Sequence, residues 1–405
     1  MVTNLQAIKH SNRSAILKHI RQHGPISRQT IARELGMSPS TVSAAVGDLM
    51  GSELVKVMGQ GVSTGGRRPI LVEINPAGGL VVAVDVASSA RERVVRAAAF
   101  DLKNDAILEL ERPQEIYGNE AMLGSIQSII AELLDSPEFD HQTPLAVGIS
   151  VPGLVDAQAG ELLYTSIGVR NLPLAHILKD SLQAPVIIRN SEDAAALGEF
   201  TFGCCNNCHS LLYISVGSGI GAGLVVGGEI YQPGRKSIGE IGHMTVQADG
   251  PQCHCGNRGC LSALVTSETI VQTVQEALDK GYLPQIDVLA LTPIERLDIH
   301  QLMAAAQAGD PLCKEIFAEK AEWVGIAIAA AINILNPGVI VLGGELFEDG
   351  DYFFSLTRAV VQRRALPEYF DTDRLICSTS GRNAGLRGVG ILALEELFRV
   401  SNQPV

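Results

Sequence analysis

The sequence lacks a hydrophobic stretch that could cross a membrane, and no apolar signal core lies near its first residues. A membrane-spanning helix needs about 20 apolar residues, whereas the longest apolar run, from Val324 to Leu335, is shorter and contains Asn333. Because no export signal is visible, the eight cysteines are expected to stay reduced and to serve metal binding rather than disulfides. These absences predict a cytoplasmic protein without membrane insertion.

Positive charge is scarce in most of the chain, whose formal net charge is −13 over 405 residues. Residues 1–75 nevertheless carry nine Lys or Arg against four acids, a net charge of +5, which leaves −18 for the remainder. A basic head on an acidic body indicates that a polyanion binds at the head alone. The length allows two or three domains with sizeable cores.

Residues 1–75 are predicted to form a winged helix-turn-helix domain. Ser27 is a suitable cap for one short helix, and after a turn at Gly36, Ser38 and Pro39 favour the start of a second. The second helix would bury its apolar side chains and turn a face of small polar residues outward, which suits close approach to the major groove. The residues expected to contact DNA from this helix are Ser38, Ser40, Thr41, Ser43 and Ala44.

Two short strand patterns, residues 54–57 and 70–74, follow the helices and predict a wing. Its tip carries Arg67 and Arg68 beside two glycines. Arginines on such a tip can enter a narrow, A·T-rich minor groove. We therefore expect operator DNA as a partner, although the helix pattern by itself also fits a small domain used for protein contacts.

Residues 76–405 alternate between strand and helix patterns in two comparable halves. Buried strands are predicted at residues 80–86, 145–151, 184–190, 211–216 and 339–344, and long helices at 120–134 and 322–335. This alternation predicts an α/β body of two lobes with a cleft between them. A glycine-rich loop, residues 217–223, joins two strands, and such a loop can approach phosphate through backbone N–H groups.

One histidine and three cysteines cluster between residues 243 and 260. Imidazole nitrogen and thiolate sulfur are the ligands that zinc prefers, and four protein ligands close a structural site. The predicted ligands of a structural Zn²⁺ are His243, Cys253, Cys255 and Cys260. Glu240 lies beside this set, so the metal would hold it in a fixed relation to His243, as a small polar ligand requires. His254 is expected to be a bystander.

A second group of cysteines, Cys204, Cys205 and Cys208, follows a predicted helix. His209 is adjacent, so metal binding is one interpretation. We expect reduced thiols in a loop instead.

The body resembles the ROK family, which includes sugar kinases and winged-helix transcriptional repressors. The matching pieces are Val84-Asp85, residues 148–156, 190–199, 217–223 and 239–243, and the cysteine knuckle. The head matches the repressor branch, so the resemblance covers the whole chain. It implies that the body has the two-lobed, actin-like ATPase fold of sugar kinases. The domains expected are 1–75, 80–195 with a returning C-terminal helix at 386–400, and 196–385, which would carry the knuckle and an oligomerisation surface.

Several positions depart from the pattern of the family's active kinases. Their phosphate loop has the pattern Asp-x-Gly-x-Thr. Here the loop begins at Asp85, and Ala87 stands in place of the glycine. The Cβ of Ala87 would obstruct the approach of a phosphate group. Their catalytic aspartate corresponds to Ser191, which cannot accept a hydroxyl proton at neutral pH. The acid that follows the last knuckle cysteine is also absent. We therefore predict that the protein is not an enzyme and does not use ATP.

A sugar or sugar phosphate is the effector that the resemblance implies. The residues that would contact it in the cleft are Gly153, Asn171, Asn190, Glu240 and His243. The predicted function is a sugar-responsive transcriptional repressor of carbohydrate-use genes that acts as a homodimer or homotetramer. Two alternatives stay open: an active sugar kinase with a DNA-binding head, and a repressor controlled by a protein partner such as a sugar transporter subunit.

Overall fold

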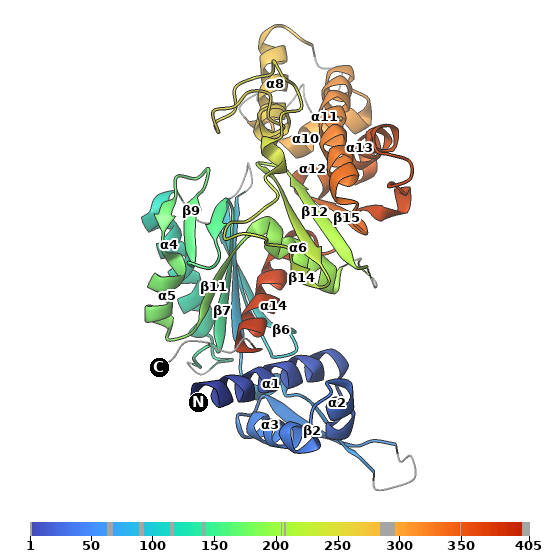
Figure 1. Cartoon of the computed structure of the whole chain (residues 1–405). Coiled ribbons are helices and arrows are strands. Elements are labelled where there is room, and N and C mark those ends of the chain that lie inside the picture. Colours follow the sequence, from blue (N-terminus) through green and yellow to red (C-terminus); the bar gives the residue numbers. More distant parts are fainter. Residues whose placement is uncertain are drawn as a thin grey trace.

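A small N-terminal head and a body built on two open β-sheets follow one another along the molecule (Figure 1). The computed structural model describes residues 2–62, 68–88, 93–113, 117–139, 142–203, 205, 208–283, 296–348 and 350–398. Within these residues no helix is both long and apolar enough to cross a membrane.

The described residues of the head form three helices and a three-stranded sheet in the order β1-β3-β2. Ser27 and Ser38 cap α2 and α3 as predicted, since each hydroxyl accepts the backbone N–H of the third residue beyond it. Pro39 stands in the first turn of α3. The elements are α1 (Val2–His23), β1 (Ile26–Ser27), α2 (Arg28–Glu34), α3 (Pro39–Gly51), β2 (Val55–Gln60) and β3 (Ile70–Ile74).

The first lobe is built on a five-stranded sheet in the order β11-β7-β4-β5-β6, in which β11, β7 and β4 are parallel and β5 and β6 antiparallel. A smaller antiparallel sheet in the order β10-β9-β8 accompanies it. Alternate residues of β4 face opposite sides: Val82 and Val84 pack towards α4 and α5, and Val81 and Ala83 towards α14. The elements are β4 (Val81–Ser88), β5 (Arg93–Phe100), β6 (Ala106–Pro113), α4 (Gly118–Leu134), β7 (Ala146–Val151), β8 (Leu154–Asp156), β9 (Glu161–Tyr164), β10 (Arg170–Leu172), α5 (Leu174–Leu182) and β11 (Val186–Asn190).

The second lobe is a five-stranded sheet in the order β14-β13-β12-β15-β16, with a layer of helices on its outer face (Figure 1). The strands are β12 (Ser210–Val216), β13 (Ile220–Val226), β14 (Glu229–Ile230), β15 (Val339–Gly343) and β16 (Leu375–Cys377). The helices are α7 (Ser262–Val265), α8 (Ser267–Asp279), α10 (Ile299–Ala308), α11 (Pro311–Leu335), α12 (Glu345–Glu348) and α13 (Asp351–Arg364).

Two helices, α6 (Ser191–Phe202) and α14 (Ala384–Phe398), connect the lobes. They cross with their backbones in contact: a Cβ on Gly198 would lie 2.1 Å from the Ala384 carbonyl oxygen, and one on Gly388 would lie 1.8 Å from that of Ala194. α14 packs on the first-lobe sheet through Leu386 and Val389, while other residues of both helices cover the inner face of the second sheet. The pair thus defines the floor between the lobes.

The head is joined to the first lobe by one continuous apolar cluster. Side chains of α1 and α3 share this cluster with Phe100 and Leu102 of the first lobe and Leu394 of α14. The carboxylate of Glu73 in the head forms ion pairs with Lys56 at 3.4 Å and with Lys103 of the body at 3.0 Å. Lys103 also donates a hydrogen bond to it. Although its burial opposes the effect, these lysines hold the pKa of Glu73 below its ordinary value.

Two sequence expectations need correction. Helix α11 begins at Pro311 rather than at residue 322, because Asp310 accepts the backbone N–H of Cys313 and caps it. Cys205 and Cys208, expected to be reduced, are joined by a disulfide. Cys204 lies outside the described residues.

Candidate functional site

The exposed face of α3 is the first candidate site. Ser38, Ser40, Ser43 and Ala44 are exposed, and Thr41 is half-buried. The Ser38 hydroxyl lies 2.7 Å from that of Thr41 and 2.9 Å from that of Ser40, so the first turn carries a linked group of hydroxyls. Val42, Val46 and Leu49 are buried on the opposite face, as the sequence predicted. Figure 1 places α3 on the side of the head that faces away from the body.

The wing lies next to this face and is formed by β2 and β3, which pair antiparallel. Arg68 is exposed at the end of the wing, whereas Arg67 lies outside the described residues. The first helix supplies further basic groups: Lys9 pairs with Asp48 at 3.2 Å, and Arg13 donates to the Ser52 hydroxyl at 3.0 Å. Both contacts lie at the C-terminal end of α3, so these two residues brace that helix against α1.

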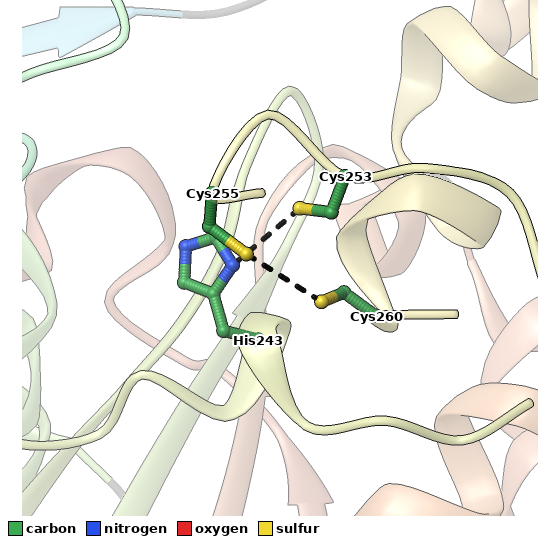
Figure 2. A group of neighbouring side chains, drawn as sticks. All are labelled: His243, Cys253, Cys255 and Cys260. Atoms are coloured by element: carbon green, nitrogen blue, oxygen red, sulfur yellow. Dashed lines mark hydrogen bonds between the residues drawn. The ribbon is translucent and has the colours of Figure 1, made fainter. Parts of the chain in front are cut away.

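The second site is the knuckle, where the four predicted ligands come together (Figure 2). The ligand atoms of His243, Cys253, Cys255 and Cys260 all lie within 4.8 Å of one another. The Sγ atoms of Cys255 and Cys260 are 3.7 Å apart, and Cys253 Sγ is 3.6 Å from His243 Nδ1. Zinc binds sulfur at about 2.3 Å and nitrogen at about 2.0 Å. In a tetrahedral site these bonds place two sulfur ligands about 3.8 Å apart, and a sulfur and a nitrogen ligand about 3.6 Å apart. The donor set therefore fits a tetrahedral metal ion.

Local backbone geometry brings these ligands together. Gly256 and Gly259 have φ values of 92° and 66°, and a Cβ on Gly259 would lie 1.6 Å from the Gln247 carbonyl oxygen. Burial and the adjacent thiols of Cys255 and Cys253 raise the pKa of Cys260 to about 12. A divalent cation offsets this cost, because thiolates bind it directly. His254 is not part of the group.

The third site is a cleft of about 2500 Å³ between the lobes. Gly153, Asn190, Glu240 and His243, four of the five predicted effector contacts, line it. Asn171 does not: it is exposed on β10, and its neighbour Arg170 lines the cleft instead.

Asn190 is largely occupied by the protein itself. Its Oδ1 accepts the backbone N–H groups of Glu192 and Asp193 and so caps α6. Its Nδ2 donates to the Gly153 carbonyl at 2.9 Å. Gly153 has φ 98°, and a Cβ there would lie 2.2 Å from the Tyr164 carbonyl oxygen. These two residues therefore build the wall of the cleft.

Glu192, which sequence reasoning missed, also lines the cleft. The Ser191 hydroxyl donates to its Oε2 at 3.0 Å. Burial raises the pKa of Glu192, and the charge of Glu240 adds to the rise. Asp193, one position on, is buried with an unpaired Oδ1, and its burial together with the charge of Glu192 raises its pKa to about 7.

Asp85, at the start of the altered phosphate loop, faces an arginine. Strand pairing sets Asp85 opposite Arg96 and Arg96 opposite Glu111. Arg96 lies 3.4 Å from the Asp85 carboxylate and donates to Glu111 at 2.9 Å. Arg96 also donates to the Arg382 carbonyl at 3.2 Å. A guanidinium group thus faces the carboxylate at this end of the cleft. Burial nevertheless raises the pKa of Asp85, and Arg96 only reduces that rise.

The glycine-rich loop is explained in part by packing. A Cβ on Gly223 would lie 2.2 Å from the Glu192 carbonyl oxygen, and one on Gly221 would lie 2.9 Å from Glu192 Cγ. The N–H of Gly217 donates to the Gly219 carbonyl and closes a tight turn. Contact with α6 therefore requires two of these glycines without any phosphate.

Models of known families match both parts of this architecture. The ROK family model matches residues 83–396, and a winged helix-turn-helix DNA-binding model matches residues 10–56. The chain belongs to the ROK family. The head and the sugar-kinase-type body are those of the transcriptional regulators in this family, as the sequence predicted.

Similar proteins agree with this assignment. The chain is 31% identical to a putative xylose repressor of Caldicellulosiruptor sp. (strain Rt8B.4), over 98% of both chains. It is 29% identical to the DNA-binding transcriptional dual regulator NagC of Escherichia coli K12, over 91% of this chain and 88% of NagC.

Two solved structures show the same fold. A ROK family transcriptional regulator, described as a homologue of the E. coli MLC protein, has a TM-score of 0.83 at 25% identity and covers 96% of both chains. A ROK hexokinase from Thermus thermophilus has a TM-score of 0.64 at 27% identity and covers 78% of this chain and 99% of its own. The body is thus shared with a kinase, and nearly the whole chain with a regulator.

Proposed function

We propose that the protein is a sugar-responsive transcriptional repressor of carbohydrate-use genes. The observation that carries the proposal is the union of a capped recognition helix, exposed on the far side of the head, with a sugar-kinase-type body that encloses a large cleft. Relatives named as a xylose repressor and as NagC match this chain over 97% and 88% of their own length. Operator DNA would bind at the head and the effector in the cleft.

The DNA-binding contacts we assign are those of α3 and the wing. Small side chains at Ser40, Ser43 and Ala44 let the helix backbone approach base edges. Arg68, with its neighbour Arg67, would reach the adjacent minor groove. A two-fold operator requires two heads, so the working form would be a homodimer or a homotetramer.

In the cleft we assign the effector contacts to Glu240 and His243, with Gly153 and Asn190 as the supporting wall. Zn²⁺ would be structural, bound by His243 and the three knuckle cysteines. Nε2 of His243 lies 4.0 Å from the Glu240 carboxylate, so a metal ion on Nδ1 would fix the ring and leave Nε2 facing that carboxylate.

Catalysis is not part of the proposal. Ser191 cannot act as a general base, and the Asp85 carboxylate is paired with Arg96. Relatives named repressors agree with a regulatory role. Turnover of ATP in the presence of any sugar would contradict this assignment.

The test is selection of bound duplexes from a random-sequence DNA pool, followed by competition with sugars. We expect an inverted-repeat site, and its release from the protein by one sugar or sugar phosphate at millimolar concentration. Failure to select any sequence would contradict the DNA-binding role. Selection of a site that no sugar releases would instead favour control by a protein partner, such as a sugar transporter subunit.

A further inference from the structure

The floor of the cleft holds a carboxylate whose position is fixed by packing. Glu192 follows Ser191 at the start of α6 and rests against Gly221 of β13. A Cβ on Gly221 would lie 2.9 Å from Glu192 Cγ and 3.3 Å from its Oε2. The bare glycine therefore leaves the space in which the carboxylate sits, and the Ser191 hydroxyl holds its orientation through a 3.0 Å hydrogen bond.

A second carboxylate approaches the same strand from the knuckle. Gly239 lies against Ala222, whose N–H donates to the Gly239 carbonyl at 2.8 Å. A Cβ on Gly239 would lie 1.8 Å from the Ala222 carbonyl oxygen, so only glycine permits this contact. Glu240, the next residue, lines the cleft together with Glu192. The two side chains thus come from α6 and from the segment that precedes His243, and both line the cleft beside β13.

In the part of the chain that the structure describes, neither carboxylate is paired with a Lys or Arg side chain. Among the described residues, no lysine or arginine forms an ion pair with Glu192 or Glu240, and the nearest basic group to Glu240 is His243 at 4.0 Å. Burial raises the pKa of Glu192, and the negative charge of Glu240 adds to the rise. Carboxylate oxygens accept hydrogen bonds. Because Glu192 is buried beside Glu240 without a Lys or Arg partner among the described residues, the pair favours a ligand that brings hydrogen-bond donors over one that brings further negative charge.

We propose that Glu192 is a specificity-determining residue of the effector site, and that it forms with Glu240 a subsite for the hydroxyl groups of an unphosphorylated sugar. The inference rests on the proposed function and extends it, since it chooses between a free sugar and a sugar phosphate at this position. Hydroxyl groups donate to both carboxylates, whereas a phosphate offers only acceptor oxygens and negative charge and is repelled. Glu192 supplies, one residue further along the chain, the carboxylate that position 191 lacks.

The experiment is isothermal titration of the full-length, zinc-loaded protein with xylose, ribose, glucose and N-acetylglucosamine, and with the 5- or 6-phosphate of each. The variants are Glu192→Gln and Glu192→Ala. Glu268→Gln is the matched control, because Glu268 lines the same cleft from α8, and burial likewise raises its pKa. Thermal midpoints of the ligand-free variants report on folding.

We expect one free sugar to bind and its phosphate ester to bind at least about tenfold more weakly. Loss of a charged hydrogen bond should weaken binding roughly 10- to 100-fold in Glu192→Gln and Glu192→Ala, with Glu268→Gln unchanged. If the sugar binds these two variants as tightly as the unmodified protein, or if the phosphate ester is the tighter ligand, the inference is overturned while the proposed function stands. If the unmodified protein binds no sugar or ester at all, the sugar-responsive function falls as well.

Discussion

Arg96 lies between two carboxylates because three neighbouring strands place Asp85, Arg96 and Glu111 opposite one another. Asp85 and Arg96 are both nearly inaccessible to solvent, with exposed fractions of 6% and 9%. Removing one partner of a buried ion pair leaves the other charge uncompensated, at a cost of about 3–5 kcal/mol. We therefore expect Arg96→Met to lower the free energy of unfolding by about that amount in urea titration at pH 7.

The double variant Asp85→Asn/Arg96→Met supplies the control for this prediction. It removes both charges, so it should recover most of the lost free energy. Arg93→Met, at the exposed start of the same strand, should change stability little. An Arg96→Met protein as stable as the unmodified one would show that the pair does not hold these strands.

At the knuckle, the residue-scale prediction concerns metal content. Cys255→Ser removes one of four ligands, so zinc measured by mass spectrometry of the purified protein should fall from one ion per chain, and the thermal midpoint should fall with it. His254→Ala is the matched control, since this neighbour is outside the ligand group, and it should retain zinc. An unmodified protein that holds no zinc, even after reconstitution under reducing conditions, would contradict the assignment.

A site could be predicted from the sequence where its residues lie close together along the chain. The knuckle could be found from the sequence because its ligand types lie within a short stretch and the turn glycines stand between them. Arg96 could not, because only the register of β4 against β5 sets it opposite Asp85. Glu192 could not be predicted either, because its place over Gly221 depends on contact between α6 and β13.

At the scale of elements, α3 can be tested by separating its cap from its exposed face. Ser38→Ala removes the hydroxyl that accepts the Thr41 N–H, and the loss of such a cap costs about 1 kcal/mol. We expect lower stability in thermal unfolding together with weaker DNA binding, and Ser38→Asp should restore the stability.

Ser43→Leu is the counterpart of this test. Ser43 is exposed and does not cap the helix. A bulky side chain there should therefore change the free energy of unfolding by no more than about 0.5 kcal/mol. DNA binding in a mobility-shift assay should nevertheless fall, because the helix could no longer approach the major groove closely. Unchanged DNA binding by this variant would remove α3 from the interface.

Helix boundaries show the same division between local and distant causes. The start of α3 was predicted because Ser38 and Pro39 are adjacent signals. The start of α11 carries similar signals, Asp310 followed by Pro311, but the prediction followed the apolar run and so began late. The crossing of α6 and α14 could not be predicted from either segment. Gly198 and Gly388 are required because the backbone of the opposite helix lies against each of them.

On the scale of the whole molecule, the head also touches the second lobe. Lys18 of α1 lies 3.7 Å from Glu229 of β14, and both side chains are well exposed. An exposed pair of this kind contributes at most about 1 kcal/mol to stability. We expect Glu229→Lys to leave the unfolding midpoint nearly unchanged but to alter the sugar concentration that releases DNA, because closure of the lobes would move β14 relative to α1.

Reversal of both charges, Lys18→Glu with Glu229→Lys, should return the release concentration towards that of the unmodified protein at low salt. The recovery should fade as salt is raised, since exposed charges are screened. Equal release curves for all three proteins would mean that this contact takes no part in the response.

The short connection between head and body has a consequence for how the protein would measure DNA. Asn75 donates to the Glu53 carbonyl at 2.8 Å, and a Cβ on Gly78 would lie 2.2 Å from the same oxygen, so the connection has no slack. The head and the first lobe would therefore move together as one rigid unit, called here an arm. The separation between two recognition helices in a dimer is then fixed by the angle between two arms. Operator half-sites shifted by a few base pairs, out of step with the turn of the double helix, would be rejected instead of being reached by a swinging head.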